Sequence, residues 1–434
     1  MPERYWIETL GCPKNQVDSE KIAGTLAAEG LAPARSPGEA DVVVVNTCGF
    51  VEAARAESVE TILELGERRA FGARLVITGC LAARSPGELK AALPEAEVVA
   101  GYGVPVALRH RGLPGPAPVP GMDLLELPRP APGMPWAYVK VAEGCDRRCG
   151  FCAIPSFRGR QRSRPQAHVV AEVDALVAAG VREVVLVAQD LASYGRDLPG
   201  TGGLVELLAA VAARVPRVRL LYLYPASLDD RLIEAIAEGG VAYFDLSLQH
   251  VASGLLRRMR RPGSAERFLE RIATIRRRAP EAALRSSFIL GYPGETEEDH
   301  DALLGFLEEA QLDWAGFFTF SPEEGTYAMG LGDQVATALA EDRRRECSEL
   351  QDRITATRRA RLVGTACEVL IDVSGVARSH REAPEIDGLV RVPEELPAGR
   401  VVEVEIVACE GVDLVGTPVA KGAAGRVSQE VVVA

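Results

Sequence analysis

The sequence predicts a multidomain α/β protein: an N-terminal parallel α/β domain, an open six-unit (β/α) partial barrel, and a small C-terminal antiparallel β-barrel. Two observations predict it. Strand-like and helix-like segments alternate through residues 1–113 and again through 136–361, as in parallel sheets covered by helices. Residues 363–434 instead show short apolar runs separated by Gly and Pro, the pattern of a small barrel. At 434 residues the chain is too long for one ordinary domain.

The N-terminal domain, 1–113, should contain four parallel strands. The run of four valines at 42–45 is continuously apolar, as expected for a strand buried on both faces. The expected strands cover 5–10, 41–48, 74–80 and 97–100, and the helices between them cover 19–29, 52–69 and 86–93. Residues 114–135 hold eight prolines, which fit neither a helix nor a central strand, so we expect a semi-rigid linker there.

The central region, 136–361, should form the partial barrel. Its expected strands lie near 138–141, 184–188, 220–224, 244–248, 287–290 and 317–320, and a long polar helix at about 335–361 ends it. Right-handed crossovers on six parallel strands give a three-quarter barrel with its site at the carboxyl strand ends. The C-terminal barrel, 363–434, should use strands at 368–373, 388–392 and 401–407.

The composition limits the location and the partners. No apolar run approaches the ~20 residues of a membrane span, and the first residues lack a secretory signal, so we expect a cytoplasmic protein without membrane association. Nine cysteines in a reducing compartment indicate metal binding or catalysis rather than disulfides. The net charge of −12 favours a basic protein partner over nucleic acid, although an acidic protein can still carry a basic groove.

Three cysteines form the pattern C-x3-C-x2-C directly after the first strand of the partial barrel, at Cys145, Cys149 and Cys152. A structural zinc site is the alternative, but such sites take four ligands, and the next histidine, His168, lies in an expected helix. Three thiolates suit a cubane cluster whose fourth iron is open to an exogenous ligand. The motif therefore predicts an iron–sulfur cluster.

Cys12, Cys48 and Cys80 each lie at the end of a predicted parallel strand, 36 and 32 residues apart. The carboxyl ends of parallel strands line one edge of a sheet, so these cysteines should converge and hold a second cluster. The alternative is that they are small buried hydrophobic residues, which leaves their common position unexplained. The three other cysteines lack such a position, and we assign no role to Cys347, Cys367 and Cys409.

Other polar residues at the strand ends of the partial barrel are candidates for cofactor binding, and turn formation is the alternative for each. They are Gln189, Ser247, Gln249 and Ser321, together with Gly291, which permits close backbone approach. The basic run of Arg158, Arg160, Arg162 and Arg164 is either a solvated loop or a contact for a carboxylate of the substrate or cofactor. For His250 we expect a structural, hydrogen-bonded role.

The motifs resemble known families. C-x3-C-x2-C with Phe151 before its last cysteine is similar to the signature of the radical S-adenosylmethionine superfamily. Nearly the whole chain, least so in the linker, resembles the methylthiotransferases of that superfamily, and its end resembles their TRAM domain. The matching segments are GCPKNQVDSE at 11–20, NTCGFVEAA at 46–54, FRGRQRSRP at 157–165 and GYPGETEED at 291–299.

The resemblance implies two [4Fe–4S] clusters and S-adenosylmethionine, used once as methyl donor and once as radical source. It also implies a low-potential electron donor and a sulfur source. The open iron of the Cys145 cluster would chelate S-adenosylmethionine and cleave it to a 5′-deoxyadenosyl radical, while the other cluster would hold the sulfur to be transferred.

Within the family, the chain is most similar to the branch that methylthiolates an aspartate of ribosomal protein S-twelve. It reads CPKN at 12–15 and QHVA at 249–252, where the tRNA-modifying branch usually reads CQMN and QSGS. One departure from the ribosomal branch is Ser247, where proline is frequent. Residues 363–434 hold six Lys/Arg against twelve Asp/Glu, which suits a basic ribosomal protein better than tRNA. A tRNA adenosine methylthiotransferase and a non-enzymatic iron–sulfur scaffold or electron carrier remain the alternatives.

Overall fold

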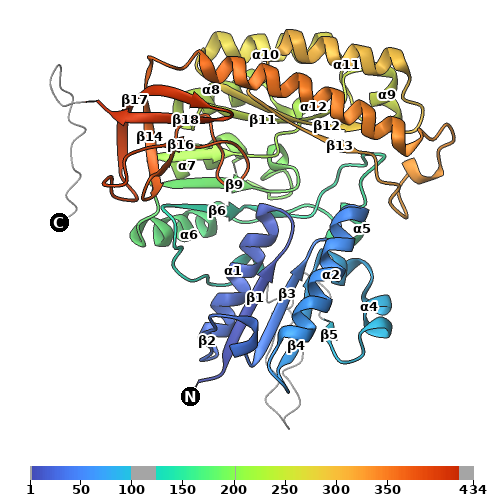
Figure 1. The fold of residues 1–434 in the computed structure, drawn as a ribbon, viewed down its shortest axis with the longest axis vertical. Helices are drawn as coiled ribbons and strands as arrows, with labels where there is room; N and C mark the ends of the chain where they lie inside the picture. The colour runs from blue at the N-terminus through green and yellow to red at the C-terminus, as the bar shows by residue number, and fades with distance from the viewer. Residues whose placement is uncertain (1, 99–123, 201, 420–434) are drawn as a thin grey trace. The chain divides into compact units, whose positions relative to one another are not determined.

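The computed structural model describes residues 2–98, 124–200 and 202–419. The chain divides into two compact units, residues 1–355 and 356–434, and each is described by itself. The first unit contains the N-terminal domain and the partial barrel (Figure 1). No helix in these described ranges is long and apolar enough to cross a membrane.

The N-terminal domain is built on a parallel sheet of five strands in the order β2-β1-β3-β4-β5. The central strand, β3, is buried along its whole length, as its run of valines predicts. The strands are β1 (Arg4–Thr9), β2 (Ala32–Pro33), β3 (Val42–Thr47), β4 (Arg74–Gly79) and β5 (Glu97–Val98).

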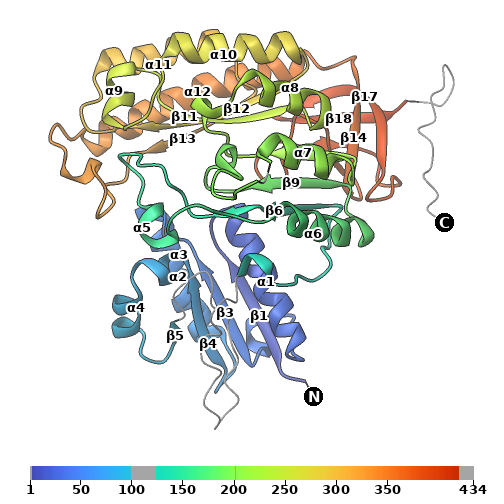
Figure 2. The same ribbon diagram turned by 180° about the vertical axis from the view of Figure 1, so that it is seen from behind.

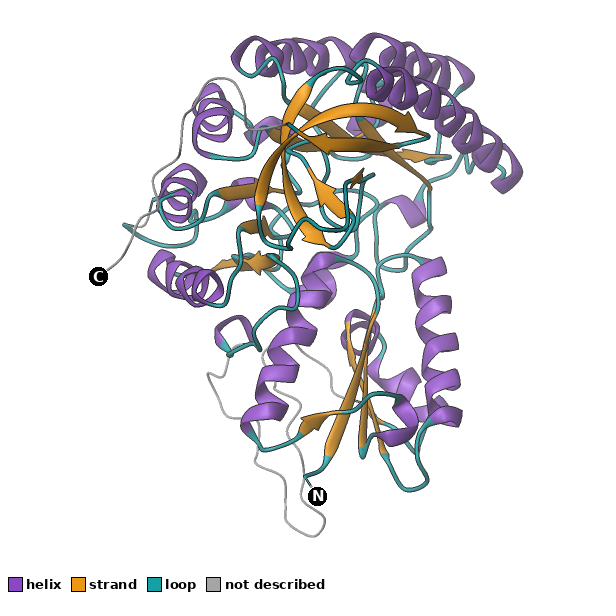
Figure 3. Ribbon diagram, turned by 60° about the vertical axis from the view of Figure 1, so that its left-hand side comes forward, coloured by secondary structure: helices purple, strands orange, loops and turns teal. Residues whose placement is uncertain are grey.

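Helices cover both faces of this sheet (Figure 3). Val42 and Val44 pack in one apolar cluster with Ile22 of α1, and the alternate residues of β3 pack with Ile62 of α2 in another. This alternation of side chains along β3 fixes which helix covers which face. The helices are α1 (Pro13–Ala28), α2 (Glu52–Arg68), α3 (Cys80–Arg84) and α4 (Pro86–Ala92).

The partial barrel has the six parallel strands that the sequence predicts. They form two three-stranded sheets, β6-β9-β10 and β11-β12-β13, which a parallel bridge between Leu223 and Leu246 connects. Figure 2 shows these strands with their helices outside. The strands are β6 (Trp136–Lys140), β9 (Glu183–Val187), β10 (Arg217–Leu220), β11 (Tyr243–Gln249), β12 (Ala283–Leu290) and β13 (Trp314–Thr319).

The two faces of these strands differ in chemistry. Phe244, Leu246 and Phe288 belong to the large apolar core against the helices. The alternate residues of β11, including Asp245 and Ser247, therefore point to the inner face, which is polar. The covering helices are α6 (Gln166–Ala178), α7 (Leu204–Ala212), α8 (Asp230–Gly239), α9 (Ser253–Arg258), α10 (Ala265–Arg278), α11 (Glu297–Ala310) and α12 (Thr337–Ala360).

The second unit contains a closed barrel in the order β14-β15-β16-β18-β17, around a core that includes Val369, Ile371 and Val404. The barrel is not wholly antiparallel as predicted, because β16 and β18 pair in parallel. The prediction also missed two of its strands, β15 and β18. The strands are β14 (Ala366–Val373), β15 (Val376–Arg378), β16 (Val390–Arg391), β17 (Val401–Glu410) and β18 (Asp413–Pro418).

Three further differences from the prediction concern the first unit. Helix α1 begins at Pro13, six residues earlier than expected, because proline is favoured at the first helical position. The prediction also missed β2 and α3. The proposed linker, 114–135, and the end of the expected strand 97–100 lie partly outside the described residues, but Leu124–Glu126 forms one 3-10 turn.

Candidate iron–sulfur sites

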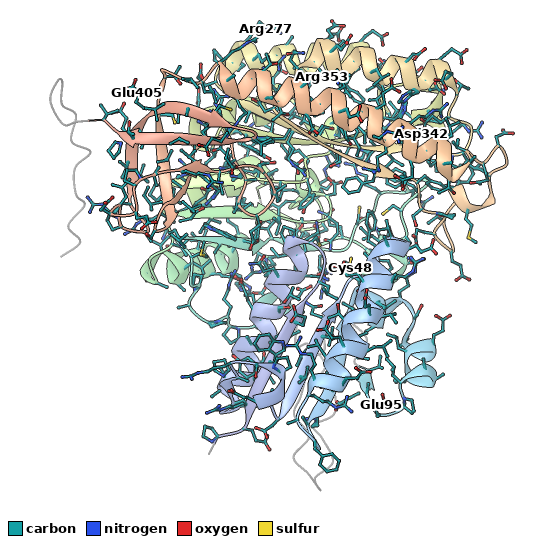
Figure 4. The ribbon with its side chains drawn as sticks, in the orientation of Figure 1. Cys48, Glu95, Arg277, Asp342, Arg353 and Glu405 are labelled. Atoms are coloured by element: carbon teal, nitrogen blue, oxygen red, sulfur yellow. The ribbon has the colours of Figure 1, made fainter. Side chains whose placement is uncertain are left out.

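The N-terminal cysteine triplet (Cys12, Cys48 and Cys80) gathers at one edge of the N-terminal sheet. Cys12 precedes α1, Cys48 follows β3 and Cys80 begins α3 directly after β4. The strands β1, β3 and β4 are adjacent and parallel, so the three cysteines leave the sheet at its carboxyl edge. Figure 4 labels Cys48 at this edge. The expected convergence of strand ends is present.

Asn15 joins the turns that carry the N-terminal cysteine triplet. Its side-chain Nδ2 donates to Leu10 O at 2.9 Å and to Thr47 O at 3.0 Å, and its Oδ1 lies 3.5 Å from Cys80 Sγ. Burial, together with the neighbouring Cys80 and Cys12 thiols, raises the pKa of Cys48 to about 11. The three thiols are therefore close enough to influence one another electrostatically.

Two glycines make the close approach of these turns possible. Gly11 and Gly79 both have φ of +92°, which side chains rarely adopt. A Cβ at Gly11 would lie 2.9 Å from Cys48 Sγ, and one at Gly79 would lie 2.4 Å from Asn46 Oδ1. The space beside the thiols therefore depends on the missing side chains of both glycines.

The loop cysteine triplet (Cys145, Cys149 and Cys152) lies between the short strand β7 (Ala142–Glu143) and helix α5 (Ile154–Arg158). Backbone hydrogen bonds hold this loop: Cys145 N donates to Gly159 O at 3.1 Å and Gly150 N donates to Met259 O at 2.8 Å. Burial raises the pKa of Cys145 to about 11 and that of Cys152 to about 12. The loop is thus a defined structure that presents three partly exposed thiols.

Two arginines and a tyrosine surround the loop cysteine triplet. The guanidinium groups of Arg147 and Arg261 lie 3.9 and 4.3 Å from the ring centroid of Tyr224. Arg261 Nη1 donates to Cys149 Sγ at 3.4 Å, and Arg147 Nε donates to Asp190 Oδ2 at 2.6 Å. Positive charge beside thiols favours their anionic, metal-binding form.

A buried ionic network connects the regions that carry the two triplets. Lys140 contacts Asp18 of α1 and donates to Glu143 Oε2 at 2.7 Å. Arg158 Nη1 lies 2.9 Å from Glu143 Oε1 and 3.4 Å from Asp18 Oδ2. Burial alone would raise the pKa of Glu143, but Arg158 and Lys140 hold it well below its ordinary value. The network therefore pairs charges of the N-terminal domain with charges of the partial barrel.

Arg158 also reaches the N-terminal cysteine triplet directly. Its Nη2 donates to Asn15 Oδ1 at 2.5 Å and to Cys80 Sγ at 3.1 Å. Within the basic run, Arg164 is likewise buried and pairs with Glu172 at 2.8 Å, whereas Arg160 is exposed. The solvated-loop interpretation is therefore wrong for Arg158 and Arg164, and the carboxylates that they contact belong to the protein itself rather than to a substrate or cofactor.

A second contact joins the N-terminal domain to the end of the partial barrel. The Glu323 carboxylate, 2% exposed, pairs with Arg84 at 2.6 Å and also with Arg55. Ser321 Oγ accepts from the backbone N–H of Glu52, the first residue of α2, at 3.2 Å and donates to Glu323 Oε1 at 2.5 Å. Ser321, a candidate for cofactor binding, thus also serves this contact.

The other candidates for cofactor binding differ in their surroundings. Gln189 donates to Glu143 Oε1 at 2.8 Å, and its own Oε1 is buried without a partner among the described residues. Ser247 and Gln249 lie on the inner face of β11, where Gln249 has φ of +73°. At Gly291, φ is +75° and a Cβ would lie 2.4 Å from Ala340 Cβ, so the close approach there is to α12.

The remaining predicted residues have structural positions. His250 is fully buried, its Nδ1 accepts from Ala252 N at 3.1 Å, and burial lowers its pKa to about 4. His168 lies on α6, as expected. Cys347 is buried on α12, and Cys367 and Cys409 lie on β14 and β17.

The number of thiols in each triplet suits an iron–sulfur cluster rather than a single metal ion. Among the residues that the structure describes, no three Cys, His, Asp or Glu side chains are close enough to share one metal ion. Each triplet offers three thiols, and a [4Fe–4S] cluster with one open iron needs that number. The positive side chains and the glycine-lined space fit an anionic cluster. Gln189 Oε1, which has no partner among the described residues, fits a polar cofactor.

Comparison with protein families assigns a class to each region. Residues 4–101 match the uncharacterized protein family UPF0004, residues 139–307 match the radical SAM superfamily, and residues 363–419 match the TRAM domain. The radical S-adenosylmethionine methyltransferase TsrM of Kitasatospora setae shares the fold, with a TM-score of 0.50 and 15% identity over 76% of this chain and 74% of that one. The fold and the loop cysteine triplet together define a radical SAM protein.

Curated relatives give the particular family. The ribosomal protein uS12 methylthiotransferase RimO of Moorella thermoacetica is 46% identical over 93% of this chain and 96% of its own length. The proteins of the same name from Chloroflexus aurantiacus and Thermus thermophilus are each 42% identical, over 95% and 94% of this chain and 99% and 98% of their own lengths. This chain belongs to the RimO family of methylthiotransferases.

Proposed function

We propose that this protein transfers a methylthio group to the β-carbon of an aspartate in ribosomal protein uS12. Its relatives are named for uS12 methylthiotransfer and share more than 40% identity over nearly the whole chain. The observation that carries the proposal is Arg158, which contacts both Cys80 Sγ and Glu143, the residue two positions before Cys145. It supports a reaction in which the two cysteine triplets act on one substrate.

The cofactors that we propose are two [4Fe–4S] clusters and S-adenosylmethionine. The N-terminal cysteine triplet would hold one cluster and the loop cysteine triplet the other. When bound, the loop cluster and S-adenosylmethionine supply the radical that an unactivated C–H bond requires. The residues proposed near S-adenosylmethionine are Gln189, Ser247, Gln249, Gly291 and Ser321, of which Gln189 has the clearest unused acceptor. A low-potential electron donor and a sulfur source complete the reaction.

The task of the protein is to position these groups and to exclude water. The ionic network is buried, with Lys140 and Glu143 at 1% and 2% exposed, so it is rigid and screened from solvent. Because Nη1 and Nη2 of Arg158 contact Glu143 and Asn15 respectively, the guanidinium group fixes the N-terminal cysteine turns relative to the loop that follows β7. An aspartate between the triplets would then meet both centres without a large domain movement.

The acidic surface of the C-terminal barrel is proposed to bind the basic ribosomal protein. Glu368 and Glu403 lie directly opposite each other on β14 and β17, and both are exposed. Like charges in this arrangement destabilise a sheet, so their presence favours a role in binding. Figure 4 labels Glu405 on the outside of the same barrel. Complementary fields raise the association rate with a positively charged partner.

Mass spectrometry of uS12 tests the reaction. The anaerobically reconstituted protein, with S-adenosylmethionine, a reductant and a sulfide source, should add one methylthio group to an aspartate of uS12. A parallel reaction with bulk tRNA should yield no methylthio-adenosine after digestion. The opposite pair of results would assign the chain to tRNA modification. Absence of 5′-deoxyadenosine in both reactions would favour a scaffold or electron carrier.

Charge reversal tests the binding surface. Replacing the exposed Glu394 and Glu395 by Lys should slow association with uS12 at low salt, and the difference should fade as screening shortens the range of charges to about 8 Å. The matched control replaces the exposed Glu57 and Glu60 of α2 by Lys, which changes the net charge equally elsewhere. Equal association rates for both variants at every salt concentration would exclude the acidic barrel as the binding surface.

A further inference from the structure

A basic surface lies in the turn after α9. From residue 246 to residue 265 the chain contains four arginines and no acidic residue, although its net charge is −12. Arg257 and Arg260 are exposed, and the side chain of Arg258 is 38% exposed. Within the described ranges, Arg257 and Arg260 form no ion pair, and Arg258 lies 3.6 Å from the exposed Asp333. This surface is therefore positive and open to an anionic partner.

Two large apolar side chains accompany these arginines. Tyr327 and Met329, in the segment after β13, are 44% and 51% exposed. The guanidinium group of Arg260 lies 3.9 Å from the ring centroid of Tyr327. Protein interfaces are enriched in arginine, tyrosine and methionine. We call this group the arginine surface; its members are Arg257, Arg258, Arg260, Tyr327 and Met329.

The arginine surface packs against the loop that carries Cys145, Cys149 and Cys152. Gly150 N donates to Met259 O, and Ala328 N donates to Gly150 O, both at 2.8 Å. A Cβ at Gly150 would lie 3.1 Å from both Arg258 O and Tyr327 Cδ1. Figures 1 and 2 show, from opposite sides, the segment after β13 between α9 and α5, the helix that follows the loop. The backbone of Gly150 therefore connects the arginine surface to the loop cysteine triplet.

The partner of this surface has to be anionic and has to act at the loop. A basic ribosomal protein would be repelled, so the substrate that we propose does not fit here. The proposed reaction also needs an electron donor, and electron transfer slows steeply with distance, so the donor has to dock beside the loop. Weak encounters between redox proteins use small interfaces. Nucleic acid is the other anionic class, but its phosphates would leave the exposed Met329 without a partner.

We propose that the arginine surface docks a small acidic electron-carrier protein, which reduces the loop cysteine site. The inference rests on the proposed function and assigns to its electron donor a charge and a place of contact. In each encounter the carrier is oxidised by one electron and the loop cluster is reduced by one, and no bond forms or breaks. Complementary charge mainly raises the association rate, which suits a carrier that has to leave after each transfer.

The test replaces Arg257 and Arg260 together by Glu in the anaerobically reconstituted protein. The probes are an acidic flavodoxin, an acidic ferredoxin and dithionite, a small reductant that needs no docking surface. Biolayer interferometry should show that both carriers associate about 10-fold more slowly at low salt, and the difference should fade as salt shortens the range of charges to about 8 Å. Formation of 5′-deoxyadenosine should slow with the reduced carriers and remain unchanged with dithionite.

Two further variants sharpen the test. Arg277→Glu with Arg278→Glu is the matched control, because both arginines are exposed and the charge change is equal. They end α10, which leads into the start of β12, so they lie away from the carboxyl strand ends; Figure 4 labels Arg277. This control should bind both carriers as the wild type does. Met329→Ala should lower the affinity about 3-fold at every salt concentration, because salt does not screen apolar contacts.

Four outcomes would count against these assignments. Equal association rates for the Arg257/Arg260 and control variants, or no binding of either carrier to the wild type at low salt, would overturn the proposal. Loss of binding to bulk ribosomal RNA, with carrier binding unchanged, would also overturn it and assign the surface to nucleic acid. A fall in iron content would show that the arginines stabilise the loop instead. Absence of 5′-deoxyadenosine from the wild type with dithionite would refute the proposed function, without reference to the arginine surface.

Discussion

The two cysteine triplets are brought together in different ways. The loop cysteine triplet lies within residues 145–152, so one loop and its own hydrogen bonds define it. The N-terminal cysteine triplet spans residues 12–80 and depends on the register of three strands and on glycine turns between them. The loop site is therefore controlled locally, whereas the N-terminal site depends on the fold of the whole domain. The N-terminal site should consequently be sensitive to substitutions that are distant in sequence from its cysteines.

Removal of each triplet should give the largest effects and separate their functions. The reconstituted wild type should contain about eight irons, and replacing Cys145, Cys149 and Cys152 by Ala should leave about four and abolish cleavage of S-adenosylmethionine. Cys12→Ala, Cys48→Ala or Cys80→Ala should instead abolish methylthio product while 5′-deoxyadenosine still forms. Iron analysis and product chromatography measure both. Loss of all iron in the loop variant, or of 5′-deoxyadenosine in a folded N-terminal variant, would contradict this division.

Gly79→Ala should damage the N-terminal cysteine site without changing any thiol. Its Cβ would meet Asn46 Oδ1 at 2.4 Å and Thr47 O at 2.5 Å, in addition to the strain at φ of +92°. We expect about half of the iron to be lost, measured by iron content and absorption spectra. Gly30→Ala is the control, because Gly30 has a similar φ of +91° but nothing within 4 Å. Equal iron in both variants would mean that the turn tolerates the clash.

Arg158→Met should have the next largest effect, because it breaks the connection between the two regions. Loss of one partner from a buried ion pair costs about 3–5 kcal/mol, and here Glu143 and Cys80 both lose a donor. Thermal unfolding of the apoprotein should shift to lower temperature, and the redox titration of the N-terminal cluster should move to lower potential. Arg160→Met, at an exposed arginine of the same run, should change neither.

Gln189→Leu should give the smallest effect and should be confined to the loop site. It removes a donor to Glu143 and a buried acceptor that has no partner within residues 2–98, 124–200 and 202–419. We expect the KM for S-adenosylmethionine to rise about 5–10-fold, as for loss of one hydrogen bond, with unchanged iron content. Isothermal titration with S-adenosylmethionine checks the affinity. A fall in iron bound by the N-terminal cysteine triplet would show that the two sites are less independent than proposed.

The sequence predicted those features that depend on local pattern or on strand order. The alternation of segments predicts both parallel regions, and the fact that Cys12, Cys48 and Cys80 end strands predicts their convergence. The sequence also contains a signal for the early start of α1, because proline is favoured at the first helical position. It contains no such signal for the parallel pairing of β16 and β18, because short strands carry no information on which neighbour they join.

The missed functional residues are those whose partners are distant in sequence. Asp18, Lys140 and Glu143 look like ordinary surface charges in the sequence, because their burial depends on packing between segments more than 100 residues apart.

The contact that Glu323 forms with the N-terminal domain affects the order in which parts of the chain gain their contacts during synthesis. Ribosomes synthesise the N-terminal domain first, and domains fold as they emerge. Yet Glu52, at the start of α2, and the side chain of Arg84 find their partners in Ser321 and Glu323, more than 230 residues later. The earliest part of the chain to leave the ribosome is thus among the last to gain all of its contacts.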